Sequence, residues 1–185
     1  LRGIGETETG HDKRDYGRGK FGRDVQEIFL AYLLGRSYVG MRTDDVIAWT
    51  TFLETYNMPP NKAVSPIDVI AIGEAAIPAL HATTVAPKQF GSVTLRDMIR
   101  SWSDVVTATE THDQAANVVH GALQHYDLDD LIGLAGAHRV FVKDSVDPLG
   151  RPIVDPVGKP VESTSLIQDH VSLAPVVVPV TDVVP

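Results

Sequence analysis

The stretch with the clearest potential for chemistry is residues 67–82, IDVIAIGEAAIPALHA, where an apolar run leads into Gly73 and then into small helix-forming residues. A strand, a tight glycine turn and a helix can hold a reactive side chain clear of a sheet, beside backbone N–H groups that stabilise negative charge. The turn reads Gly73-Glu74-Ala75-Ala76-Ile77 and contains neither serine nor cysteine. It is therefore either a reactive turn without the usual nucleophile or a structural turn.

Glu74 carries the reactive side chain of this turn. A carboxylate can serve as a nucleophile or as a general base. A carboxylate next to a helix N-terminus is also stabilised by the helix dipole without doing any chemistry. The sequence favours the second interpretation, in which Glu74 caps the helix.

A second serine-containing stretch invites comparison, Gly35-Arg36-Ser37-Tyr38-Val39-Gly40. It has one residue too many for a nucleophile turn, and it follows a helical pattern instead of a strand. We therefore expect a helix-to-helix turn in which Ser37 forms a local hydrogen bond.

The histidines do not form a metal-binding pattern. His120 and His125 are spaced i, i+5, which is poor spacing for two ligands on one helix face, and the pairs His11-Asp12 and His112-Asp113 are isolated. The chain has no cysteine, which excludes disulfides and thiolate metal sites. We expect no metal and no cofactor.

Length and charge narrow the class of protein. The chain has 185 residues, enough for one domain with its own core. Its net charge of -8 argues against nonspecific binding to nucleic acid or to an anionic membrane, since both require a basic surface. No apolar run approaches the roughly 20 residues needed to span a bilayer.

The elements that must position Glu74 alternate between helix and strand. Apolar spacing predicts a helix from Asp24 to Gly35, with Val25, Ile28, Phe29, Tyr32 and Leu33 on one face, and a second helix from about Thr43 to the segment NMPPN. Residues 67–72 have the nearly continuous apolar character of a strand buried on both faces of a parallel sheet. The remaining predictions are helices at 75–84, 112–124 and within 126–136, strands at 91–95 and 138–142, and a helical or irregular stretch at 96–106. This order predicts an α/β fold with a parallel sheet flanked by helices.

The character of the chain changes after Asp147. Proline recurs every four residues from 148 to 160, a density that blocks helix and central strand. We therefore divide the chain into a domain over residues 1–152 and an extended Pro/Val-rich tail over 153–185. The last stretch, APVVVPVTDVVP, is either an edge strand or a frayed end.

Several segments, in order, resemble the C-terminal part of the α/β-hydrolase family, in its acetylxylan-esterase-like branch. LRGIGET (1–7) resembles the family's D-x-R-G-x-G-x-T loop, and LLGRSYVGMRTDDVIAWTTFL (33–53) resembles its helix pair. IDVIAIGEAAIPALHA falls where the family has its nucleophile elbow. VHGALQHYDLDDLIGLAGAHRVFVKDSVDPLGRP (119–152) resembles the segment that ends in its acid-bearing loop.

The resemblance implies positions for the family's catalytic residues. The nucleophile, third in G-x-S-x-G, falls on Ala75, and the closing glycine falls on Ile77. The acid belongs on the loop after HRVFV, where Asp147 is the best match and Asp144 the second. The histidine belongs after one further strand, where His170 is the candidate. Without a nucleophile, the alternative is that these acids only cap a turn ahead of Pro148. For His170 the sequence favours a surface histidine.

Two hypotheses of function follow. The resemblance implies a carboxylic ester hydrolase that acts on a small ester or on acylated polysaccharide, impaired by the loss of serine or dependent on a missing N-terminal half. The alternative is a noncatalytic structural or binding module derived from an α/β hydrolase. The resemblance also implies that the oxyanion-hole loop lies outside this sequence, and that a partner chain or an N-terminal segment covers an exposed sheet edge.

Overall fold

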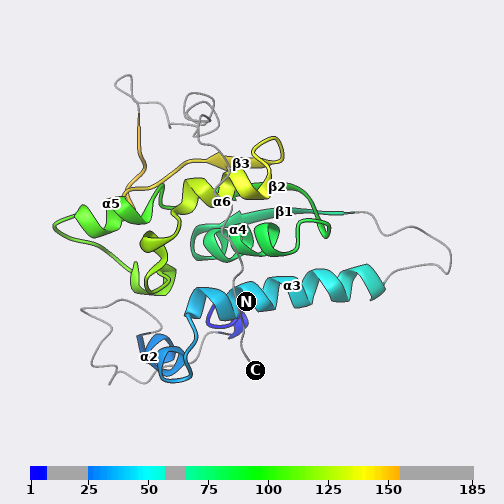
Figure 1. The fold of residues 1–185 in the computed structure, drawn as a ribbon, viewed down its shortest axis with the longest axis horizontal. Helices are drawn as coiled ribbons and strands as arrows, with labels where there is room; N and C mark the ends of the chain where they lie inside the picture. Colours follow the sequence, from blue (N-terminus) through cyan, green and yellow to red (C-terminus); the bar gives the residue numbers. More distant parts are fainter. Residues whose placement is uncertain (8–24, 57–65, 155–185) are drawn as a thin grey trace, which may run out of the picture.

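A computed structural model describes residues 1–7, 25–56 and 66–154. They contain helices α2 (Val25–Leu33), α3 (Tyr38–Tyr56), α4 (Ala76–Val85), α5 (Trp102–Thr107) and α6 (Leu128–Ala135), and strands β1 (Ile67–Ile72), β2 (Phe90–Arg96) and β3 (Val140–Lys143) (Figure 1). The strands form a parallel sheet in the order β1-β2-β3. The predicted α/β class with a parallel sheet is confirmed at this level. Residues 155–185, which include His170 and nearly all of the predicted tail, lie outside the described residues.

The sheet is covered by helices on one face only within the described residues. Val69 and Ala71 point inward on β1, as do Val93 and Leu95 on β2 and Val140 and Val142 on β3. These side chains form one core with α4 and α6. Ile70, on the other face, is 72% exposed, and Ile72 is exposed as well. The prediction that residues 67–72 are buried on both faces was wrong, because an apolar run does not show whether a second helix layer is present.

Helix α4 is the centre of the helix layer. It contacts β1 and β2 on one side and also packs against α3 and α6. Small residues allow this close approach, since Ala76, Ala79 and Ala82 are all buried. Ile77 and Leu80 are almost inaccessible to solvent and belong to the core that the helices share with the sheet. No helix within the described residues is long and apolar enough to cross a membrane.

The Gly35-Ser37 segment is the predicted helix-to-helix turn. Gly35 has a φ of +68°, a conformation that glycine adopts without steric penalty. The Ser37 hydroxyl accepts a hydrogen bond from the backbone N–H of Gly40 at 2.9 Å. This N-terminal contact starts α3 at Tyr38, earlier than the predicted start near Thr43.

The predicted helix over residues 112–124 does not form. Two short 3₁₀ turns, Ala115–Asn117 and Ala122–Gln124, take its place. The Trp102 indole N–H donates to the Asn117 carbonyl at 2.8 Å, and a continuous helix would give that carbonyl to Gly121. Gly121 itself has a φ of +74°. A buried tryptophan distant in sequence therefore overrides the local helical pattern.

Candidate functional site

The strand, turn and helix expected around Gly73 are all present. β1 ends at Ile72, Gly73 adopts a φ of +60°, and a 3₁₀ turn over Gly73–Ala75 leads into α4. A side chain at position 73 would meet no atom within 4 Å, so the positive φ is what favours glycine there. Ala75, where the resemblance would place the nucleophile, offers only a methyl group and has ordinary helical backbone angles, with φ -81° and ψ -18°. The strand, the turn and the helix are present, and the turn contains neither serine nor cysteine.

Glu74 is paired with a fully buried arginine. Nη1 of Arg42, on α3, lies 3.2 Å from Oε2 of Glu74. The side chain of Arg42 is 0% exposed and that of Glu74 is 21% exposed. The Arg42 guanidinium also lies 4.4 Å from the centroid of the Tyr38 ring, in a cation–π contact. The carboxylate beside the turn is therefore tied to α3.

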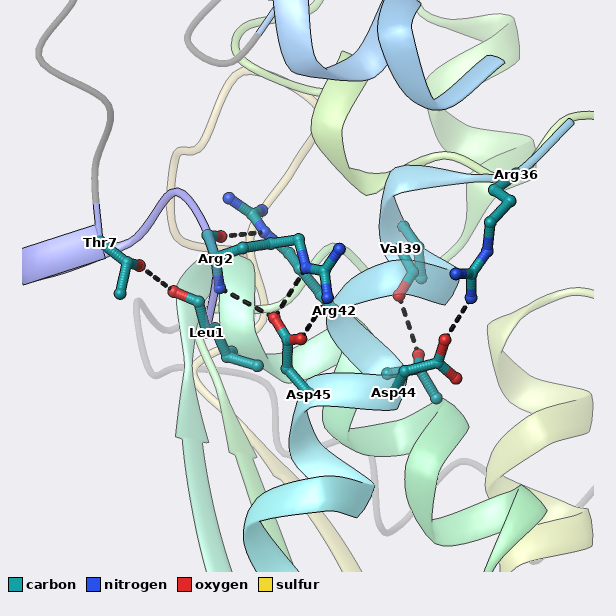
Figure 2. A network of polar contacts seen from close by, with 9 residues as sticks. Leu1, Arg2, Thr7, Arg36, Val39, Arg42, Asp44 and Asp45 are labelled. Carbon is teal, nitrogen blue, oxygen red and sulfur yellow. Dashed lines mark hydrogen bonds and ion pairs between the residues drawn. The ribbon is translucent and has the colours of Figure 1, made fainter. Parts of the chain in front are cut away.

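The same arginine also contacts the N-terminal segment, as Figure 2 shows for Arg42 and Arg2. Nε of Arg42 donates to the carbonyl of Arg2 at 3.1 Å. Arg2 in turn donates to the carboxylate of Asp45 through its backbone N–H at 3.0 Å, through Nε at 2.9 Å and through Nη2. The hydrogen bond from Arg2 holds the pKa of Asp45 below its usual value, although burial opposes this. Sequence reasoning missed this network, because Arg42 and Asp45 fall within an ordinary helical pattern.

Asp147 is held within its own turn. Its Oδ1 accepts from the backbone N–H groups of Leu149 and Arg151, both at 2.9 Å, and its Oδ2 accepts from Nε of Arg151 at 2.8 Å. These contacts, led by the hydrogen bond from the Arg151 side chain, lower the pKa of Asp147. A surface pocket of about 280 Å³ lies beside it, lined in part by Ala108, Glu110 and Pro148. The hydrogen bonds from Leu149 and Arg151 thus use the Asp147 carboxylate to stabilise its own turn.

Asp144 also has a specific partner. Its Oδ2 accepts from Nε and Nη2 of Arg96, at the end of β2, at 3.0 and 2.6 Å. The structure thus joins Glu74 to Arg42, Asp147 to Arg151 and Asp144 to Arg96. His170 lies outside the described residues, so its place beside these acids remains a prediction.

An aromatic cluster forms around His81 of α4, and the sequence did not point to it. Nδ1 of His81 lies 2.8 Å from the Ile77 carbonyl, and Nε2 lies 3.4 Å from the Tyr126 hydroxyl. A carbonyl only accepts, so Nδ1 carries the proton and Nε2 is the acceptor for Tyr126. Trp102 packs against both rings, at 5.8 Å from His81 and 5.7 Å from Tyr126. Burial lowers the pKa of His81 and raises that of Tyr126.

This cluster predicts a loss of stability in mild acid. Because the pKa of His81 is lowered in the folded chain, the unfolded chain takes up a proton first as pH falls below about 6.5. The free energy of unfolding should therefore decrease from neutral pH towards pH 5, and His81→Gln should make this decrease shallower. Urea unfolding at a series of pH values measures it. His138→Gln, at an exposed histidine, is the matched control and should keep the wild-type slope; equal slopes in all three proteins would contradict the prediction.

The described residues contain no group of three or more His, Asp or Glu side chains arranged to hold a metal ion. Comparisons of the chain with protein-family models, with curated proteins and with solved structures found no significant match. The resemblance to α/β hydrolases consequently rests on the sequence segments alone, and the structure shows a parallel sheet of the general α/β class.

Proposed function

We propose that this chain is a noncatalytic structural or binding module derived from an α/β hydrolase. The observation that carries the proposal is the pairing of Glu74 with the fully buried Arg42, beside a turn whose nucleophile position is Ala75. A serine mechanism has no nucleophile here. The carboxylate that could replace the serine is instead a link between the turn and α3.

Electrostatics support this assignment. A carboxylate nucleophile must leave its resting contacts to attack a substrate carbonyl. If Glu74 did so, a guanidinium with 0% exposure would lose a charged partner, which is unfavourable in a buried site. Asp147 is engaged in the same way, because three donors of its own loop occupy its oxygens.

An ester hydrolase of the acetylxylan-esterase-like kind is the second candidate. The observation that favours it is the position of Glu74 at the carboxyl end of a parallel strand, with its side chain 21% exposed. Ligands of open α/β sheets bind at such strand ends. The substrate class would be a small ester or an acylated polysaccharide.

An ester-hydrolysis assay separates the two candidates. We expect the full chain to release no product above the uncatalysed rate from p-nitrophenyl acetate or from acetylated xylan, and Glu74→Gln and Asp147→Asn to behave identically. Glu6→Gln, at an exposed acid that does not line the pocket beside Asp147, controls for a general loss of negative charge. Turnover by the full chain that falls at least tenfold in Glu74→Gln or Asp147→Asn, but not in the control, would overturn the proposal and establish the hydrolase.

A further inference from the structure

The helix layer extends beyond the sheet at the β1 edge. In Figure 1 the strands follow the order β3, β2, β1 from top to bottom, the helices follow the order α6, α4, α3, and α3 lies past β1. Helix α4 contacts both β1 and β2 and also packs on α3. One helix therefore overhangs the last strand of the described sheet.

Contacts at both ends fix α3 along the length of β1. Near its N-terminus, Arg42 reaches Glu74, just past the end of β1. Further along, Thr50 donates to Oε1 of Gln89 at 2.9 Å, and Gln89 donates to Thr51 at 3.2 Å. The Gln89 carbonyl accepts from the N–H of Ile67, where β1 begins. Helix α3 thus runs antiparallel to β1.

The overhanging half of α3 carries an exposed aromatic row, here called the α3 stripe, made of Trp49, Phe52 and Tyr56. Trp49 is 58% exposed and the other two are exposed as well. The three rings contact one another in sequence, with centroids 5.6 and 4.9 Å apart. Between Ala48 and Tyr56 the single charged residue is Glu54. Such a run is unusual for a helix that faces only water.

One edge of β1 adjoins this stripe. Among the described residues β1 pairs only with β2, so half of its backbone N–H and C=O groups have no strand partner within that part of the chain. Neither lysine nor proline, the residues that commonly protect an edge, occurs in β1. An added strand would both complete this hydrogen bonding and cover the underside of the α3 stripe.

We propose that residues 174–184 of this chain bind as an edge strand along β1, beneath the α3 stripe. Prolines 175, 179 and 185 are all odd-numbered, so in a strand their missing N–H groups would lie on one side. That side would face away from β1, the arrangement in which an edge strand tolerates proline. Valines 176, 178 and 180 share the opposite parity and would place three β-branched side chains together on one face.

Chain length permits this path. About 20 residues separate Val154 from the first of these prolines, and extended they span about 65 Å. The sheet between the β3 side and the β1 edge is only about 10 Å wide. Direct pairing of β1 with β1 of a second copy is unfavourable, because the two α3 helices would clash. Each α3 is about 10 Å wide, the width of two strands, and extends beyond the β1 edge. The proposal is independent of the proposed function, since it concerns neither Glu74 nor Asp147.

The full chain contains no cysteine, so a nitroxide on Val178→Cys is a unique probe. We expect it to broaden the amide signals of β1 and the indole signal of Trp49, while the buried indole of Trp102 is less affected. A mixture of labelled chain and isotope-enriched unlabelled chain should show no broadening, which identifies the contact as intramolecular. No broadening of β1 in the labelled chain itself would overturn the proposal, and so would broadening seen only in the mixture.

Hydrogen exchange gives a second readout that does not need a label. The β1 N–H groups that do not donate to β2 lie on the other edge of the strand. Their hydrogen exchange should be about tenfold slower in the wild type than in Val178→Asp. Val177→Asp is the matched control, on the opposite face of the proposed strand, and should change these amides less. Fast exchange in the wild type, or equal exchange in Val178→Asp, would refute the strand. If protection of the β1 amides disappeared on dilution, the strand would come from a second copy of the chain, and the intramolecular proposal would be refuted.

Discussion

Asp127→Ala is expected to lower the free energy of unfolding by about 3 kcal/mol, since one carboxylate caps the N-termini of two helices and each cap is worth about 1 kcal/mol or more. Asp127 is the N-cap of α6, where its Oδ1 accepts from the Leu128 N–H at 2.7 Å. The same oxygen accepts from the Trp102 N–H, in the first turn of α5, at 2.8 Å.

The second carboxylate oxygen is equally engaged. Oδ2 of Asp127 accepts from the hydroxyls of Ser101 and Ser103, at 2.6 and 2.9 Å. Alanine would leave the donors of both helices without this acceptor, and buried donors without partners are costly. Asp127→Asn retains one acceptor oxygen, so its effect should be intermediate.

The pH dependence of this effect has a definite sign. Burial raises the pKa of Asp127, but the hydrogen bonds from Ser101, Trp102, Leu128 and Ser103 outweigh burial and lower it. A lowered carboxylate pKa stabilises the fold above the unfolded value near 4, and this contribution is lost as pH falls through the folded pKa. The difference between wild type and Asp127→Ala should therefore shrink in acid.

Urea unfolding at neutral pH and in acid measures both expectations. Asp129→Ala is the matched control, because it removes the same charge from the first turn of α6. Burial, followed by repulsion from Asp127, raises the pKa of Asp129, so its removal should change stability by less than about 0.5 kcal/mol. Equal effects of the two alanine substitutions would show that Asp127 acts only through the helix dipole.

The sequence revealed those elements whose signals are local. Val25 and Ile28 gave α2 its buried face, Gly73 marked the turn, and the apolar run 67–72 marked β1. Phe29, Tyr32 and Leu33 are predicted on the buried face of α2 but are exposed, because α3 and the Ala115–Asn117 turn cover only part of that short helix.

Long-range contacts were not visible in the sequence. Trp102 removes the Asn117 carbonyl from the helix expected at 112–124, and nothing near Asn117 signals this. Asp127 reads locally as a cap for one helix, yet it also caps α5, some 25 residues earlier in the chain. In the candidate site, too, the local feature was visible in the sequence and the long-range partner was not. Its turn was readable from residues 67–82, whereas the partner of Glu74 lies on α3.

Glu74→Ala is expected to lower the free energy of unfolding by about 2 kcal/mol, less than the 3–5 kcal/mol typical of a fully buried pair because Glu74 is partly exposed. Arg42 has 0% exposure, so its desolvation remains when the carboxylate is removed. Arg42→Met keeps the bulk of the side chain without its charge. Combined with Glu74→Ala, it should be less destabilising than the sum of the two single changes.

A surface pair between Asp44 of the same helix and Arg36, which lies just before it, provides the matched control. Arg36 and Asp44 form an ion pair with side chains 49% and 56% exposed, and exposed pairs of this kind contribute about 0–1 kcal/mol. Urea unfolding of the variants Arg36→Met and Asp44→Ala, alone and together, should therefore give a much smaller coupling energy than the Arg42–Glu74 cycle. If the Arg42–Glu74 coupling were no larger than that of the surface pair, Glu74 would not be committed to α3. The Arg42 contact would then not hold the carboxylate away from chemistry at the turn, and the ester-hydrolase candidate would become the stronger of the two.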